Sequence, residues 1–154
     1  MLVAAALAAS ASAISRPQVF SLLAISAQNP QPINGFTFQR DPQGGDAVQI
    51  QDSLYRWAGA KKGARAGRDH GLVTFLTNDG NAGASILVTV QFYLQQGTIL
   101  VDGIVRLPGN GPATFTLPIV GGTGDYDGAR GYLSVRDLGN GNQNKSNMEF
   151  HLLR

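Results

Sequence analysis

Short runs of alternating apolar and polar residues, separated by turn residues, constrain the fold of this chain more than any other feature. An alternation of period two is typical of a β-strand with one buried face, and no long window has the period of an amphipathic helix. In the longest run, Ser85–Leu94, the residues Ile86, Val88, Val90 and Phe92 share one face. The runs expected to form strands are Gln18–Ala27, Gly35–Arg40, Ala47–Asp52, Gly71–Thr77, Ser85–Leu94, Thr98–Leu107, Ala113–Val120, Tyr132–Leu138 and Asn147–Leu153.

Turn-forming residues connect these runs. Of 154 residues, 20 are Gly, 7 are Pro and only 14% are charged, which excludes a coiled coil or a long helical bundle. Dipeptides such as Asn29-Pro30 and Asp41-Pro42 are typical of turns between strands. Closing an antiparallel meander of eight or nine strands removes both exposed edges. The sequence therefore predicts an all-β domain, an eight-stranded antiparallel β-barrel, whose interior is filled or holds one small ligand.

The N-terminal segment has the composition of a targeting signal. Met1–Ala13 is apolar and made of small residues, and it ends in Ala11-Ser12-Ala13, which matches a signal-peptide cleavage site. The segment is too short to span a membrane. We expect residues 1–13 to be a signal-like leader, residues 14–154 to form one barrel domain, and the protein to be secreted without a membrane span. The alternative is a leader that is simply disordered.

Charge and metal-ligand content exclude several classes of function. The net charge is +2, from 12 Lys and Arg against 10 Asp and Glu, so nucleic acid is not an expected partner. The chain has no Cys, which excludes disulfides, thiol catalysis and Cys-ligated metal sites. Its two His residues, His70 and His151, are too few for a three-His zinc site. We expect no metal and no cofactor.

A basic segment lies in the first half of the chain, and no acid interrupts it. Its cations are Arg56, Lys61, Lys62, Arg65 and Arg68. We interpret it as a solvated loop; contact with an anionic polymer or a membrane surface is the alternative. Asp69-His70 follows directly and resembles an acid–base pair. Adjacent residues of a strand point to opposite faces, however, so a surface His is the simpler interpretation.

A Gly-rich segment, Val120–Gly131, is the most informative part of the sequence. It lacks the spacing of a dinucleotide-binding loop, the Gly-Lys-Ser/Thr of a P-loop and the later ligands of an EF-hand. It therefore predicts a sharp bend between two strands, where Gly allows positive φ and close backbone approach. Asp125 and Arg130 lie in this bend. They either form a pair that pins the loop or both point into a cavity.

This segment, with its flanking residues, resembles a known family. Pro118–Tyr132, PIVGGTGDYDGARGY, is similar to the C-terminal signature of dirigent proteins, of bacterial dirigent-like chains and, more loosely, of plant allene oxide cyclases. Gly97-Thr98-Ile99 resembles another strand of the family, and the resemblance covers roughly residues 18–153. It implies the allene oxide cyclase barrel, which is similar in fold to lipocalins. These proteins act by holding intermediates in a shaped apolar cavity, with little covalent chemistry and no cofactor.

The resemblance also implies roles for particular residues. Asp125 and Arg130 match the motif where the family places polar pocket residues, and they are the candidate catalytic residues. The candidate substrate-binding residues, expected to converge on the lumen, are Asp52, Gln91, Tyr93 and Gln39. The first strand carries no acid, unlike the family, which argues against acid-assisted cyclisation. The Cys pair of plant dirigent proteins is absent too, which favours the bacterial type.

Three functions are compatible with these observations. The first is a secreted dirigent-like barrel that binds a small hydrophobic or phenolic intermediate and directs its stereoselective coupling or cyclisation. An oxidase acting upstream would then supply the radical, and the protein would be a homo-oligomer, as family members often are. The second is a non-catalytic, lipocalin-like binder of a small apolar molecule. The third is a structural or interaction barrel with a packed lumen.

Overall fold

The computed structural model describes residues 18–58, 61–139 and 144–153. The leader predicted at residues 1–13 lies outside these ranges and stays a prediction. The strands are β1 (Gln18–Ser26), β2 (Gln31–Ile33), β3 (Ala47–Ile50), β4 (Asp52–Ala58), β5 (Lys61–Asn78), β6 (Ala84–Leu94), β7 (Gly97–Leu107), β8 (Thr114–Gly124), β9 (Arg130–Asp137) and β10 (Lys145–Leu153). One 3₁₀ turn, η1 (Gly80–Ala82), connects β5 to β6.

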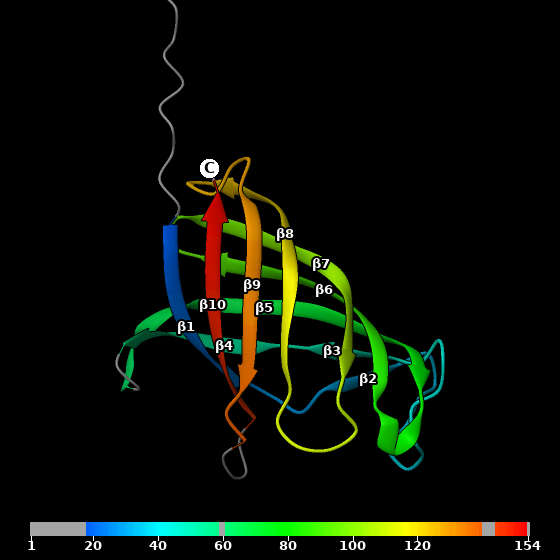
Figure 1. The fold of residues 1–154 in the computed structure, drawn as a ribbon. Helices are drawn as coiled ribbons and strands as arrows, with labels where there is room; N and C mark the ends of the chain where they lie inside the picture. Colours follow the sequence, from blue (N-terminus) through cyan, green and yellow to red (C-terminus); the bar gives the residue numbers. More distant parts are fainter. Residues whose placement is uncertain (1–17, 59–60, 140–143, 154) are drawn as a thin grey trace, which may run out of the picture.

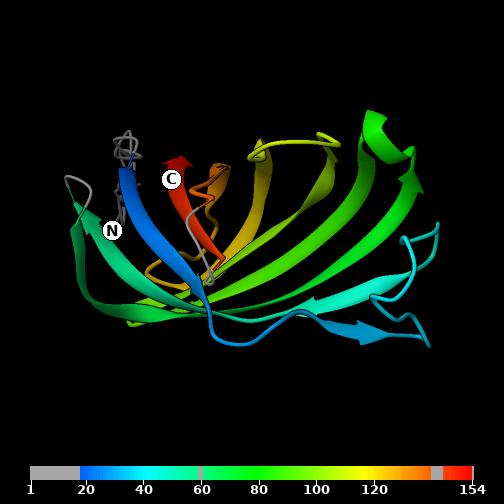
Figure 2. The same cartoon turned by 90° about the horizontal axis from the view of Figure 1, so that it is seen from below.

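Eight of these strands form a closed antiparallel barrel, so the predicted fold class is confirmed. The order around the barrel is β5-β4-β1-β10-β9-β8-β7-β6, and pairing of β6 with β5 closes it. The short strands β2 and β3 extend the sheet beyond the barrel from the C-terminal half of β5. Figure 1 shows the strands side by side, and Figure 2 shows how the sheet curves round on itself.

Two local predictions were wrong. The basic segment is a pair of strands rather than a solvated loop, since β4 and the first part of β5 form a hairpin that pairs from Ser53 to Ala58. Gly35–Arg40 forms turns rather than a strand, because Asn34 and Gly35 both have positive φ and break the extended backbone. Phe36 of this segment is nevertheless buried.

The alternation of each strand decides which side chains enter the barrel. Phe92 and Phe150 are fully buried and meet edge-on, with ring centroids 5.0 Å apart. Residues opposite each other in an antiparallel pair share a face, so Phe20, opposite Phe150, and Asp69, opposite Phe92, also point inward. The middle of the barrel is thus packed mainly with apolar side chains, and it also holds the buried Asp69.

No helix in the described ranges is long and apolar enough to cross a membrane.

Candidate functional site

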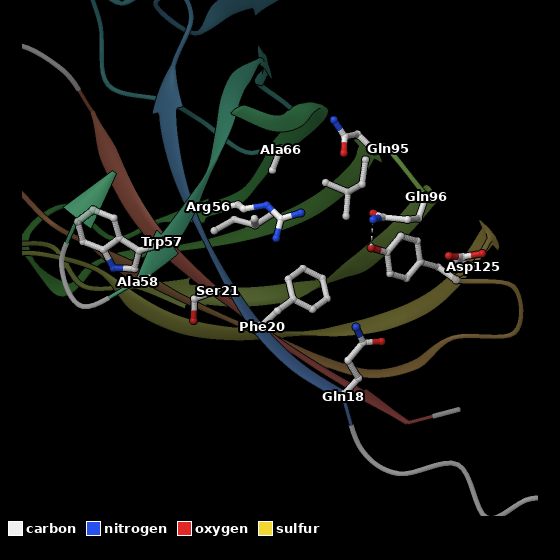
Figure 3. Close-up of a pocket in the computed structure, with 13 residues that line it drawn as sticks. Gln18, Phe20, Ser21, Arg56, Trp57, Ala58, Ala66, Gln95, Gln96 and Asp125 are labelled. Atoms are coloured by element: carbon white, nitrogen blue, oxygen red, sulfur yellow. Dashed lines mark hydrogen bonds between the residues drawn. The ribbon is translucent and has the colours of Figure 1, made fainter. Parts of the chain in front are cut away.

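A pocket of about 570 Å³ lies at the end of the barrel where β1 begins and β6 ends. Figure 3 shows its lining residues, which come from β1, β4, β5, the end of β6, the β6–β7 turn and the β8–β9 loop. The apolar lining consists of Phe20, Leu22, Trp57, Ala58, Ala66, Leu94 and Tyr126, and the polar lining of Gln18, Ser21, Arg56, Gln95, Gln96 and Asp125. A concave site that combines apolar and aromatic side chains with polar groups is typical of small-molecule binding.

The aromatic wall of the pocket is held in place by the core. The Phe20 ring stacks on Phe150 with centroids 4.8 Å apart, and the Tyr126 ring is 6.3 Å from Phe20. Tyr126 is itself buried, and its hydroxyl donates to Oε1 of Gln96 at 3.5 Å. Because these rings are fixed by neighbours rather than by a ligand, the wall is preorganised for an apolar molecule.

Arg56 provides the cation of the pocket, a role that the loop interpretation had missed. It lies opposite Leu22 of β1 and follows the fully buried Leu54 by two positions, so it shares the inward face of β4. Figure 3 shows its side chain reaching into the pocket. The β4–β5 pairing is irregular here, which lets the adjacent Trp57 line the pocket as well. The alternation of Asp52, Leu54 and Arg56 is the sequence signal that could have placed Arg56 inside.

Asp125 provides the carboxylate of the pocket. It lies in the β8–β9 loop, is exposed, and its backbone N–H donates to the carbonyl of Gln96 at 2.8 Å. This bond holds the loop against the β6–β7 turn, so both segments form one rim. The structure thus places this predicted residue at the pocket, while its catalytic role stays a prediction.

Asp52 lies deeper in the barrel, where it forms a carboxyl pair with Asp69. Asp52 is opposite Ser26 on the inward face of β4, and its backbone N–H donates to Oδ1 of Asp69 at 2.9 Å. Asp69 is fully buried, and its Oδ2 has no hydrogen-bond partner within the described part of the chain. Neither carboxyl is part of the pocket lining.

Burial changes the protonation of both carboxyls. Loss of solvation, together with the nearby Asp52 carboxylate, raises the pKa of Asp69 to about 8. The pKa of Asp52 is also raised by burial, although a hydrogen bond from Ser26 opposes the shift. Asp69 therefore carries a proton at neutral pH. Sequence reasoning did not identify it, because it considered Asp69 only as a possible acid–base partner of His70, although Asp69 is in phase with Gly71 and Val73.

Comparison with known proteins decides the family. The family model described as "Allene oxide cyclase barrel like domain" matches residues 23–150, most of the chain. The chain belongs to this family. A comparison with curated protein sequences finds no match.

Several solved structures share the allene oxide cyclase barrel of this chain. Pyocyanin demethylase is 22% identical with a TM-score of 0.65, and the match covers 85% of this chain and 98% of that one. The exo-specific intermolecular Diels–Alderase AbnU is 15% identical with a TM-score of 0.66, covering 89% and 96%. A pterocarpan synthase dirigent protein is 12% identical with a TM-score of 0.69, covering 90% and 96%. At these identities the similarity shows the fold.

In this allene oxide cyclase barrel Arg130 does not line the pocket. It begins β9, is exposed, and its Nη1 donates to the carbonyls of Val120 at 3.0 Å and Ala129 at 2.8 Å. Within the described ranges no ion pair joins it to Asp125. Arg130 thus pins the bend through backbone carbonyls, and the expected Asp–Arg pair is not formed. The catalytic role of Arg130 stays a prediction, and the place of Arg130 outside the pocket lining argues against that role.

We expect Arg130→Ala to lower the free energy of unfolding by about 1 kcal/mol, because two backbone carbonyls lose a charged donor. Arg136→Ala is the matched control, since Arg136 is exposed on the same strand and makes no side-chain hydrogen bond within the described residues. Chemical denaturation of both variants measures the difference. Equal stability of the two variants would contradict the pinning role.

Gln91 and Tyr93 lie on the outer face of the barrel, which corrects their expected place in the lumen. They alternate with Val90 and Phe92, whose side chains are buried inside. The Tyr93 hydroxyl donates to Oε1 of Gln91 at 3.0 Å, and the His70 ring meets Tyr93 edge-on at 5.7 Å. The register of β5 and β6 therefore brings these residues together, but outside the cavity.

Gln39 also lies away from the pocket. It is exposed in the connection between β2 and β3, at the opposite end of the barrel from the pocket. The expectation that it lines the lumen depended on a strand at Gly35–Arg40, and the structure has turns there. Of the six predicted site residues, only Asp125 lines the pocket.

Proposed function

We propose that this protein binds a small, largely apolar, unsaturated molecule in the pocket and directs its cyclisation or coupling. The observation that carries the proposal is the pocket itself: a rigid aromatic wall with polar groups from four separate parts of the chain, at the end of a closed barrel. Such a site fixes the conformation and facial exposure of a reactive molecule, which accelerates and selects one ring closure without covalent chemistry.

The names of structurally similar proteins support this proposal. A Diels–Alderase, a dirigent protein and a cyclase described as catalysing a [4 + 2] cycloaddition share the fold. We extend to this chain only their common feature, control of a reaction of a small organic molecule inside the barrel. Export of the domain and supply of a phenolic radical by a separate oxidase belong to the same proposal. Assembly into a homo-oligomer fits the exposed apolar side chains of Ile104 and Tyr132 on the outer face.

Non-catalytic binding is the second candidate, and one observation favours it. Asp69, the carboxyl with the most strongly raised pKa, is buried outside the pocket lining. The one carboxylate in the lining, Asp125, is exposed to solvent. A pocket of this kind can hold a molecule without transferring a proton to it.

A coupling assay tests the proposed function. Coniferyl alcohol and a one-electron oxidase are incubated with and without the protein, and the products are resolved on a chiral column. We expect an enantiomeric excess that rises with protein concentration. Asp125→Ala should reduce it about tenfold, since a charged hydrogen bond to an oriented substrate is lost.

Asp127→Ala is the matched control for this assay. Asp127 is exposed in the same loop but does not line the pocket, so its variant should retain the enantiomeric excess. A racemic product together with saturable binding of a neutral apolar probe would favour the non-catalytic binder. Failure of such a probe to bind would contradict both candidates.

A further inference from the structure

We propose that the molecule taken by this pocket is an anion, with one carboxylate-like or sulfonate-like group bound by Arg56 and an apolar body packed on the aromatic wall. The inference rests on the proposed function only in requiring that the pocket binds a small molecule. It adds the chemical class of that molecule and the residue that selects it.

The first argument is that Arg56, whose side chain is exposed at the open end of the barrel, lines the pocket without a protein partner. No hydrogen bond or ion pair of its side chain occurs among the described residues, although the group has five N–H donors. It shares the pocket lining with Leu22 and Leu94, and Figure 3 shows it pointing toward the middle of the lining residues. A guanidinium matches a planar carboxylate in a bidentate geometry, and its donors are otherwise satisfied only by water.

The second argument is the separation of charge across the pocket. Asp125, the only acid among the described residues of the lining, lies beside Gln96 on the opposite rim from Trp57 and Ala58, as Figure 3 shows. It does not pair with Arg56. A ligand anion therefore finds its complement on the β4 side, while Asp125 suits a hydroxyl or another hydrogen-bond donor at the far end of the same molecule.

The third argument is the charge of the hairpin that forms this rim. The sequence from Arg56 to Arg68 contains five cations and no acid. None of these cations forms an ion pair within the part of the chain that the structure describes. Lys62 lies over the Tyr55 ring at 3.8 Å and Arg68 over the Tyr93 ring at 5.5 Å, so both stay on the outer surface. The positive electrostatic potential of the hairpin attracts anions to the open end of the pocket, and Arg56 is the cation of the hairpin that reaches into the pocket.

A pair of fluorescent probes tests this inference. Anilinonaphthalene sulfonate is an anion, and N-phenylnaphthylamine is nearly the same molecule without the sulfonate. Trp57, the single tryptophan of the chain, lines the pocket, so energy transfer from it to the probe reports binding to the protein, and the variants below assign that binding to the pocket. We expect the native protein to bind the sulfonate about tenfold more tightly than the neutral probe, the effect of one charged hydrogen-bonded contact.

Variants assign the effect to Arg56. Arg56→Gln should weaken binding of the sulfonate about tenfold and change binding of the neutral probe less than twofold. Arg56→Lys should restore part of the loss. Arg65→Gln is the matched control, because it removes a cation from the same hairpin that is not in the pocket lining, and it should leave both affinities within twofold. Unchanged binding of the neutral probe also shows that each variant is folded.

The outcomes separate this inference from the proposed function. If neither probe binds, the pocket does not hold small molecules and the proposed function fails with the inference. If both probes bind equally well and Arg56→Gln weakens neither, the inference is overturned while the proposed function stands. If Arg65→Gln weakens sulfonate binding as much as Arg56→Gln does, the diffuse charge of the hairpin selects anions and the assignment to Arg56 is overturned.

Discussion

Asp69→Asn should stabilise the protein by about 5 kcal/mol at pH 8 and change its stability little near pH 4. Asp69 is fully buried, and its pKa is raised to about 8 by burial and by the neighbouring Asp52 carboxylate. Asparagine imitates the protonated side chain and keeps an oxygen to accept the N–H of Asp52. The substitution therefore removes a free-energy cost of folding. That cost is either the burial of a charged Asp69 or the uptake of a proton by Asp69 when the chain folds.

The direction of the pH dependence follows from the two states. An unfolded Asp loses its proton near pH 4, whereas folded Asp69 keeps it up to about pH 8. Between these values folding takes up a proton, so the free energy of unfolding falls as the pH rises. The stabilising contribution is complete below the unfolded pKa and is lost by the time the pH passes the folded pKa.

Chemical denaturation of native protein and variants between pH 4 and pH 9 measures this effect. Asp41→Asn is the control, since Asp41 is exposed in the β2–β3 connection, and its variant should follow the native curve. A flat native curve over this range would show that Asp69 is ionised in the folded protein. Asp52→Asn should lower the folded pKa of Asp69, because it removes the charge that opposes ionisation.

Gly131→Ala should destabilise the barrel by about 3 kcal/mol or more and lower its Tm by roughly 10 °C. Gly131 has a φ of +130°, and a Cβ there would lie 1.9 Å from the carbonyl oxygen of His151. That carbonyl belongs to β10, which pairs with β9 through Leu152 opposite Gly131. An added methyl group therefore meets both backbone strain and a steric clash with the neighbouring strand.

Gly121→Ala is the matched control from the same Gly-rich segment. A Cβ at Gly121 meets nothing within 4 Å, and the residue has no positive φ, so the variant should stay within about 0.5 kcal/mol of the native protein. Gly122→Ala should behave like Gly131→Ala, because its Cβ would lie 2.4 Å from the carbonyl oxygen of Tyr126. Thermal melts distinguish the three variants, and equal Tm values would contradict the argument.

The Gly-rich bend shows what could be predicted from local sequence. Gly tolerates positive φ and close backbone approach better than any other residue, so the Gly residues of Val120–Gly131 by themselves predicted a bend. The contacts that Asp125 and Arg130 make in that bend could not be predicted in this way. Arg130 bonds the carbonyl of Val120, ten residues earlier, and Asp125 faces β1 and β4 across the barrel end.

Arg56 and Asp69 show why charged residues on the inward face of the barrel escaped prediction. Both alternate with buried neighbours, but charged residues are seldom placed inside. The place of each residue in the barrel explains why it nevertheless faces inward. Arg56 stands where the barrel opens into the pocket, and Asp69 stands where Asp52 donates a backbone N–H to it from the adjacent strand.

Strand alternation, turn residues and the Gly-rich segment determined by themselves that the chain forms an eight-stranded antiparallel barrel, because backbone preference and side-chain period are local properties of consecutive residues. Only the tertiary structure decided which polar residues share one cavity. Register between strands sets this: it turns Gln91 and Tyr93 outward, and it brings Arg56 of β4 and Asp125 of the β8–β9 loop to the same pocket. Such pairing depends on contacts between distant segments, which no single stretch of sequence encodes.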